Sequence, residues 1–326
     1  MSEGSANKYP LIDYLKFFAA FLIVGIHTEP FGNWFWLDKA FGLLTRVAVP
    51  FFFTATAFFF FQGEATWKRC FKYCLRILRL YVFWSVVYYT VYFIKYGEFS
   101  ENIFLNFFVH GGYLHLWFLH ACIVAMLIMT ALVRLLKNNH YPVIYSLAAI
   151  TFALGVLIST YSCVTVQTPF FESILHSRFI RLIGTKNGLF YGFPFFALGF
   201  FFAKHDLKVN TSGSIAGIII SFIILAAESM FAVTKLGVNQ TVLWFSMVPL
   251  TLFVFAAGLS VTIKSQNHSV FFRKCSTGIY CVHPLFIIIL ENCLNGILLM
   301  LAVSVLSFAA AAVYYSFLQN TKLITR

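Results

Sequence analysis

The sequence has 326 residues, of which 60% are hydrophobic and only 10% are charged, and its mean hydropathy is +0.84. These values exclude an ordinary soluble protein and are typical of a polytopic membrane protein. The formal charge of +12 is explained by positive loops on one side of a membrane and by anionic lipid headgroups, so it predicts no nucleic-acid partner. The seven cysteines are scattered without a CxxC pair, and they predict neither a disulfide framework nor a metal site.

Apolar runs of about 20 residues, the length that a helix needs to cross a bilayer, recur along the chain. Backbone groups in lipid must be satisfied within their own segment, so these runs are expected to be helices. We therefore predict an all-α polytopic protein with a single transmembrane domain over residues 1–326, in which about ten helices form one bundle. The spans are expected near residues 11–28, 41–61, 75–94, 114–135, 141–160, 188–204, 212–234, 240–262, 276–293 and 296–318.

The distribution of Lys and Arg among the loops predicts the orientation. With a cytoplasmic N-terminus, the inner side collects fifteen of these residues and the outer side seven. Both termini are therefore expected in the cytoplasm. The first apolar run is too long for a signal-peptide core and lacks a small-residue cleavage site, so we expect it to remain in the mature protein.

The first span, DYLKFFAAFLIVGIH, begins with Asp13 and Lys16 and ends with His27. At about 100° per residue these side chains share one face of a helix, and a rise of 1.5 Å per residue separates Lys16 from His27 by about 16 Å. One interpretation is an interfacial ion pair, a snorkelling lysine and a histidine at the outer headgroups. The other is a functional site, because ionisable groups left in lipid cost several kcal/mol.

Four cations follow one another at helical spacing where the third span begins: Arg69, Lys72, Arg76 and Arg79. Such a stripe is unfavourable without an anion to neutralise it. Ordinary positive-inside charge against lipid phosphate explains Arg69 and Lys72 as well as a ligand does. For the deeper Arg76 and Arg79 we favour a polyphosphate ligand such as coenzyme A, because guanidinium groups bind phosphate through two hydrogen bonds.

Other polar side chains lie at the edges of predicted spans. Residues 110–120, HGGYLHLWFLH, place three histidines around Trp117, and STGIYCVHPLF places Tyr280 and His283 inside the ninth span. Taken singly, Trp117 is typical of an interfacial aromatic belt, and a histidine before Pro284 is typical of a polar group that satisfies a helix kink. The segment TKNGLFYGFPFFALG opens the sixth span with Lys186 and Asn187.

Taken together, these segments resemble the membrane acyltransferase-3 family, which includes bacterial polysaccharide O-acetyltransferases. The matching pieces are a basic residue followed after ten residues by a histidine (Lys16 and His27), RVAVPFFFTATAFFF, RILR, HLWFL, NGLFYGFPFFALG and GIYCVHPLF. They occur in family order from residue 9 to about 290, although Thr56 and Ala57 replace the usual SG of the second-span signature. The pattern is also similar to enterobacterial-common-antigen acetyltransferases and to the membrane part of vancomycin-resistance serine racemases. No racemase domain is expected, since the chain stops eight residues after the tenth span.

The resemblance implies O-acyl transfer from cytoplasmic acyl-CoA to a hydroxyl of a cell-envelope glycan or lipid-linked sugar. Acetyl-CoA is the expected donor, and no metal is expected. It implies that His27 is the general base or the acyl carrier and that Asp13 orients Lys16. The donor's phosphates would be held by Lys16, Lys72, Arg76 and Arg79. The acceptor site would be shaped by Arg46, His115, Trp117, Asn187, Tyr280 and His283. The expected location is the bacterial inner membrane, in contact with lipid, and an oligomer is compatible with the sequence.

Two other classes of function stay open. A transporter also places charges along a path through the membrane, but the last five spans show no convincing repeat of the first five. A non-catalytic partner subunit is disfavoured because Lys16 and His27 are both present. The acceptor is left open among wall or capsular sugars, lipid-linked glycans and a small amino acid.

Overall fold

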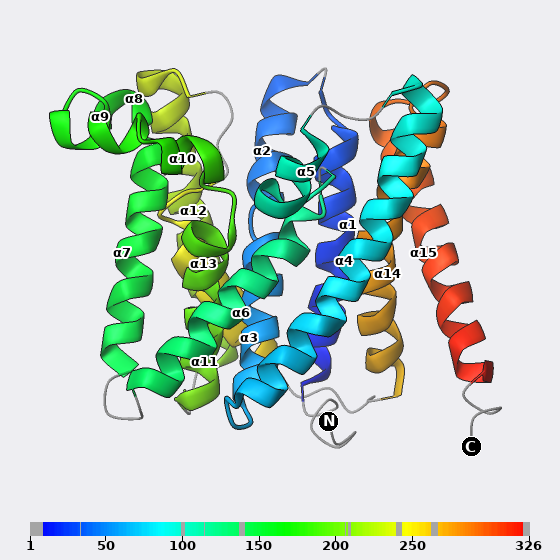
Figure 1. The fold of residues 1–326 in the computed structure, drawn as a ribbon, viewed down its shortest axis with the longest axis horizontal. Helices are drawn as coiled ribbons and strands as arrows, with labels where there is room; N and C mark the ends of the chain where they lie inside the picture. The colour runs from blue at the N-terminus through cyan, green and yellow to red at the C-terminus, as the bar shows by residue number, and fades with distance from the viewer. Residues whose placement is uncertain are drawn as a thin grey trace. The chain divides into compact units, whose positions relative to one another are not determined.

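The computed structural model describes residues 9–32, 34–98, 102–113, 115–136, 141–205, 207, 210–238, 243–261 and 267–321. These residues form helices and connecting turns, with no strand in the described ranges, so the predicted all-α polytopic membrane fold is confirmed. The elements are α1 (Pro10–Thr28), α2 (Phe35–Thr45), α3 (Ala48–Phe61), α4 (Trp67–Tyr96), α5 (Ile103–Leu105), η1 (Asn106–His110), α6 (Trp117–Leu136), α7 (Tyr141–Ser159), α8 (Ser162–Thr165), α9 (Pro169–Leu175), α10 (Arg178–Ile183), η3 (Gly188–Gly192), α11 (Phe193–Lys204), α12 (Thr211–Leu236), α13 (Met247–Ser260), α14 (Asn267–Leu290) and α15 (Gly296–Thr321) (Figure 1).

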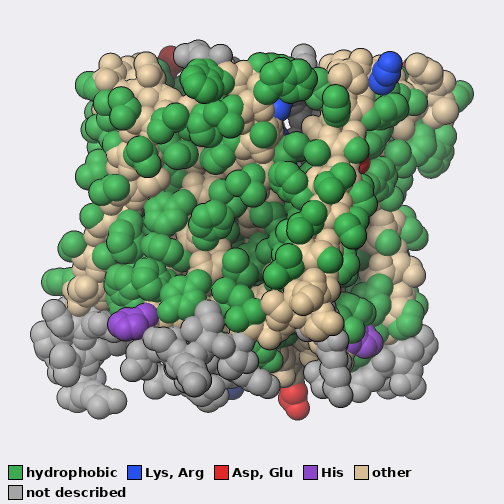
Figure 2. All heavy atoms as spheres, turned by 180° about the vertical axis from the view of Figure 1, so that it is seen from behind, with side chains coloured by type: hydrophobic (Ala, Val, Ile, Leu, Met, Phe, Trp, Pro, Cys, Tyr) green, Lys and Arg blue, Asp and Glu red, His purple; other side chains and the backbone are tan. Residues whose placement is uncertain are grey.

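Each predicted span coincides with helix. Within the described ranges seven helical stretches are long and apolar enough to cross a membrane, and they contain α1, α2 with α3, α4, α6, α7, α12 and α15. The two shorter apolar stretches, Gly188–Lys204 and Met247–Ser260, match the sixth and eighth predicted spans, and α14 matches the ninth. Hydrophobic side chains dominate the face drawn in Figure 2, where charged side chains are few.

Some expectations fall outside the described residues. The fourth predicted span begins there, at residue 114, and the eighth both begins and ends there, at residues 240 and 262. Six of the cations that predict the orientation also lie outside: Lys8, Lys137, Lys208, Lys264, Lys322 and Arg326.

Helix ends differ from the predicted ends where polar residues extend a helix beyond its apolar run. Helix α4 begins at Trp67 rather than near residue 75, because Thr66 caps it by accepting a hydrogen bond from the backbone N–H of Arg69 at 3.3 Å. Helix α14 begins at Asn267 rather than near residue 276, which places Arg273 inside the helix. The cationic stripe and Arg273 are therefore helical residues rather than loop residues.

The chain divides into two compact units, and each is described by itself. Unit 1 comprises residues 1–52, 208–219 and 250–326, and unit 2 comprises residues 53–207 and 220–249. That all residues form one bundle stays a prediction.

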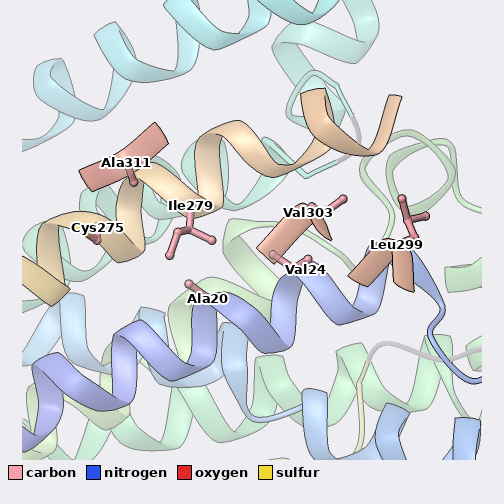
Figure 3. Close-up of a cluster of buried hydrophobic side chains, with 7 residues drawn as sticks. All are labelled: Ala20, Val24, Cys275, Ile279, Leu299, Val303 and Ala311. Atoms are coloured by element: carbon pink, nitrogen blue, oxygen red, sulfur yellow. The ribbon is translucent and has the colours of Figure 1, made fainter. Parts of the chain in front are cut away.

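The core of unit 1 lies where α1, α14 and α15 pack together (Figure 3). Its buried side chains come from all three helices: Ala20, Val24, Cys275, Ile279, Leu299, Val303 and Ala311. Glycine permits close approach at two points. A Cβ on Gly278 would lie 2.6 Å from the Ala311 Cβ, and one on Gly25 would lie 2.5 Å from the Phe41 ring of α2. Larger residues there would push α15 or the Phe41 ring away.

In unit 2 small residues bring two pairs of helices close together, η3 with α6 and α11 with α3. A Cβ on Gly188 of η3 would lie 2.4 Å from the Val124 side chain of α6, and one on Gly199 of α11 would lie 2.2 Å from the Thr54 carbonyl of α3. The same atom would lie 2.8 Å from the Ala57 side chain. The small residue in the second-span signature therefore has a packing role, because it admits α11.

A carboxylate ties α12 to the start of α13 in unit 2. Glu228 accepts hydrogen bonds from the backbone N–H groups of Phe245 and Ser246, both at 2.9 Å, and from the Ser246 hydroxyl. It also accepts from the Tyr161 hydroxyl at 3.1 Å, and burial together with the neighbouring carboxylate raises the pKa of Tyr161 to about 12. Tyr161 therefore stays a donor at every physiological pH, and Glu228 is satisfied by neutral groups alone.

Candidate functional site at two ends of a helix pair

Helices α1 and α14 of unit 1 run side by side in the same direction. Near their starts Asp13 lies beside Arg273, in the middle Ala20 and Val24 pack with Ile279, and near their ends His27 lies beside His283. Helix α1 is continuous over these positions, so Asp13 and His27 are fixed relative to each other. The pair thus has a charged cluster at one end and a histidine pair at the other, with an apolar contact between them.

Asp13 is the most deeply buried ionisable group at the charged end. Its side chain is 0% exposed, and its Oδ2 lies 3.7 Å from Nη1 of Arg273. Lys16, partly buried one turn further along α1, and Ser269 of α14 also interact with this carboxylate. A buried carboxylate needs such partners, because an isolated charge is very costly to bury.

At the other end, the rings of His27 and His283 have their centroids 5.3 Å apart and are tilted by 36°. His283 is fully buried, and its Nδ1 lies 3.1 Å from the Ile279 carbonyl oxygen. Since a carbonyl only accepts, Nδ1 of a neutral His283 must carry the hydrogen, and its Nε2 carries the lone pair. Two protonated imidazoles at this separation would repel, so the pair favours at most one positive charge.

Pro284 follows His283 inside α14. A proline has no N–H, so the carbonyl of residue 280, four positions earlier, loses its helical donor. The His283 ring donates to a different carbonyl, that of Ile279, and this bond fixes the orientation of the ring. That His283 satisfies a helix kink stays a prediction.

Two further predicted residues of unit 1 lie at different places. The ring of Tyr280 is buried with its centroid 6.4 Å from that of His283, so it belongs to the histidine end. Arg46 is partly buried and lies at the break between α2 and α3, where the sequence predicts one uninterrupted span.

The cationic stripe of α4, in unit 2, points away from the buried face of that helix. Lys72, Arg76 and Arg79 are exposed, while Cys70, Cys74, Tyr81, Ser85 and Tyr88 form the buried face. Arg76 lies over the Tyr73 ring at 5.3 Å. Arg69 differs from the other three cations, because it donates to the carbonyls of Glu64 and Phe60 and so fastens the turn before α4. Three cations of the stripe are thus accessible to an anion.

His115 and Trp117, near the start of α6, lie in an aromatic cluster of unit 2. His115 is buried and meets the Tyr88 ring edge to face at 4.9 Å. Trp117 lies 5.4 Å from the Tyr191 ring, and the Lys186 ammonium lies 4.9 Å from the Trp117 ring. An aromatic wall next to a cation is suited to a polar ligand with apolar faces.

Asn187 serves as the cap of η3. Its side-chain oxygen accepts from the backbone N–H groups of Leu189 and Phe190 at 2.8 and 2.9 Å, and its side-chain nitrogen donates to the Gly184 carbonyl at 2.8 Å. These bonds occupy most of the amide's capacity. Asn187 therefore has a local structural role that is independent of a ligand.

Arg273 is a residue of the charged end that the sequence pattern does not single out. It stands among the positive residues before the ninth predicted span, although it precedes His283 by ten positions much as Lys16 precedes His27 by eleven. That repeated spacing between a cation and a histidine is the sequence feature that indicates a site role for Arg273. Among the described residues no group of three or more His, Cys, Asp or Glu side chains is placed to hold a metal ion.

A comparison with known protein families assigns the chain. The family model described as "Acyltransferase domain" matches residues 9–317, nearly the whole sequence. The chain belongs to the acyltransferase-3 family. Membership confirms the resemblance inferred from the motifs, and it identifies the protein as a membrane acyltransferase by family.

The curated relatives are named racemases rather than acyltransferases. An "Amino-acid racemase" of Enterococcus faecalis is 26% identical over 298 residues, which is 86% of this chain and 41% of that protein. A "Serine/alanine racemase" of Enterococcus gallinarum is 28% identical over 242 residues, which is 68% of this chain and 33% of that protein. The acyltransferase-3 chain therefore spans about two fifths or less of the length of these relatives. No solved structure matches it.

Proposed function

We propose that this acyltransferase-3 protein transfers an acyl group from acyl-CoA to a hydroxyl of a cell-envelope glycan or lipid-linked sugar. Acetyl-CoA is the proposed donor. The observation that carries the proposal is the α1–α14 pair, which holds cations at one end and two histidines at the other. At 1.5 Å per residue, Lys16 and His27 are about 16 Å apart, comparable with the pantetheine arm of coenzyme A. One helix can therefore hold the donor's phosphates and reach its thioester.

His27 would carry the chemistry in one of two ways. As general base, it takes the proton of the acceptor hydroxyl while that oxygen attacks the thioester carbonyl, and it returns the proton to the departing thiolate of coenzyme A. As acyl carrier, its imidazole nitrogen attacks the thioester and releases coenzyme A, and the acceptor oxygen then takes the acyl group. In both routes His283 limits the rotation of the His27 ring, and its Nε2 can accept a hydrogen bond from an imidazolium at His27.

The donor and acceptor groups are assigned to opposite sides of the membrane. In unit 1, Lys16 would bind the donor's phosphates on the cytoplasmic side, with both termini on that side. For Lys72, Arg76 and Arg79 of α4 in unit 2, phosphate binding is proposed separately. Contacts with the acceptor are proposed for Tyr280 and Arg46 in unit 1 and, separately, for His115 and Trp117 in unit 2. The proposed location is the bacterial cytoplasmic membrane, where anionic lipids surround the inner loops.

Transfer can be measured directly. Membranes that contain the protein are incubated with acetyl-CoA carrying a labelled acetyl group and with extracted cell-envelope glycans or lipid-linked sugars. We expect label to enter a base-labile ester on the glycan, while membranes with His27→Ala protein give none. Label that stays in acetyl-CoA with every hydroxyl acceptor offered would contradict the proposal.

The orientation is tested by single cysteines placed at residues 68–72 in a background without exposed cysteines. A membrane-impermeant thiol reagent should reach them only from the cytoplasmic side. Labelling only from outside would reverse the assignment of the donor side.

A second candidate function is transport of a small amino acid. It is favoured by one observation, that the relatives are named amino-acid and serine/alanine racemases. Protein reconstituted in vesicles should then accumulate labelled L-serine without acyl-CoA. Uptake that His27→Gln leaves intact, with no ester formed, would replace the enzyme proposal by this one.

A further inference from the structure

Arg273 on α14 is a cation for which the proposed function has given no role. It lies at the charged end of the α1–α14 pair, and its side chain is 27% exposed, whereas its partner Asp13 is 0% exposed. The arginine thus bridges the interior of unit 1 and the region that a ligand can reach.

Two cations and one carboxylate meet at this end. Lys16 and Arg273 both act on the single carboxylate of Asp13, and they also act on each other. The other carboxylates among the described residues of unit 1 are Glu29, Asp38 and Glu291, and Glu29 and Glu291 follow the opposite ends of α1 and α14. Two cations thus share one buried carboxylate in a partly buried place, where a phosphate group would add negative charge beside them.

The contact geometry leaves Arg273 able to bind that anion. Its Nη1 lies 3.7 Å from the Asp13 oxygen, which is longer than the 2.7–2.9 Å of a charge-assisted hydrogen bond. A guanidinium carries five N–H donors in a planar fork that matches phosphate oxygens. Asp13 thus holds Arg273 in place electrostatically while the fork stays available.

We infer that Arg273 and Lys16, held by the shared carboxylate of Asp13, form a two-cation site for a phosphate or pyrophosphate group. This inference rests on the proposed function where it identifies the group as part of acyl-CoA. A phospholipid headgroup offers the same chemistry, so the experiment must separate the two sources.

The neighbouring Lys274 provides a matched control. Its ammonium lies 4.5 Å from the Tyr315 ring, and it has the same charge on the adjacent residue of the same helix. Coenzyme A binding is measured by calorimetry for the full chain in nanodiscs of phosphatidylcholine, which has no net charge. We expect Arg273→Gln to weaken binding about tenfold or more and Lys274→Gln to leave it within about twofold.

A double variant separates ligand binding from a merely structural ion pair. Asp13→Asn with Arg273→Gln removes one charge of each sign, so the net charge of the helix pair is unchanged and the protein should melt near the wild-type temperature. Coenzyme A binding should nevertheless stay weak. If the double variant binds coenzyme A as tightly as wild type, the ion pair is structural and the inference is overturned.

Inorganic pyrophosphate and anionic nanodiscs complete the experiment. If wild type binds coenzyme A and Arg273→Gln binds it equally well, the inference fails while the proposed function stands. If wild type binds no coenzyme A but binds pyrophosphate or phosphatidylglycerol through Arg273, the site stands and the acyl-CoA proposal fails. Binding of none of these three probes would overturn both.

Discussion

Two carboxylates that lie inside membrane-spanning helices, Asp13 in unit 1 and Glu228 in unit 2, are satisfied in opposite ways. Glu228 accepts four hydrogen bonds from neutral donors, two of them backbone N–H groups at the start of α13. Asp13 is surrounded by charges, with Arg273 at 3.7 Å and Lys16 one turn away. The first arrangement consists of neutral donors, whereas in the second two cations share one carboxylate. A carboxylate in a membrane helix is therefore a structural clamp in one place and part of a ligand site in the other.

Among the substitutions that test this difference, the largest effect on stability is expected at Asp13. Asp13→Asn keeps the side-chain size but leaves Lys16 and Arg273 facing each other, and removing one partner of a buried ion pair costs about 3–5 kcal/mol. We expect a clear drop in the thermal unfolding midpoint in detergent, partly restored by saturating coenzyme A. A midpoint equal to that of wild type would show that Asp13 is not holding the two cations.

The exposed cations of α4 should affect the donor without affecting stability. Arg76→Ala and Arg79→Ala are each expected to raise the Michaelis constant for acyl-CoA about 10- to 100-fold at nearly unchanged turnover, because each removes a phosphate contact. Arg69→Ala is the control, since this arginine is engaged with backbone carbonyls of its own turn. An unchanged Michaelis constant for both variants would assign the stripe to lipid headgroups.

Glu228 should show the reverse pattern. Glu228→Gln puts an amide nitrogen where a carboxylate oxygen accepted hydrogen bonds, which costs about 1–3 kcal/mol of stability. Coenzyme A binding per folded molecule should not change, and thermal melting with calorimetry on the same sample checks both statements. A large loss of binding at unchanged stability would show that Glu228 belongs to a ligand site.

The fold could be predicted because membrane helices are governed by a strong local rule. Apolar length identifies each span, since lipid offers the backbone no hydrogen bonds. The same rule misplaces the starts of α4 and α14, where Thr66 capping and the polar residues 267–274 extend helices beyond their apolar runs. It also misses the break between α2 and α3 at Arg46.

The candidate site could be predicted only in part. Helical spacing placed Asp13, Lys16 and His27 on one face of α1, and the structure turns that face toward α14. Spacing within one helix cannot identify the partner helix, so the sequence does not predict that Arg273 lies beside Asp13. Asn187 shows that a polar residue in a family motif can also serve as a helix cap.

The role of His27 is the central claim, and substitution by glutamine tests it most directly. Glutamine keeps the size and some hydrogen bonding but can neither take the acceptor's proton nor carry an acyl group. Acyl transfer by purified His27→Gln protein is compared with its melting temperature and coenzyme A affinity, and His176→Gln, outside every predicted span, is the control. We predict transfer reduced by about a hundredfold or more, with folding and coenzyme A binding retained. A well-folded His27→Gln protein that transfers acyl groups at the wild-type rate would contradict the account.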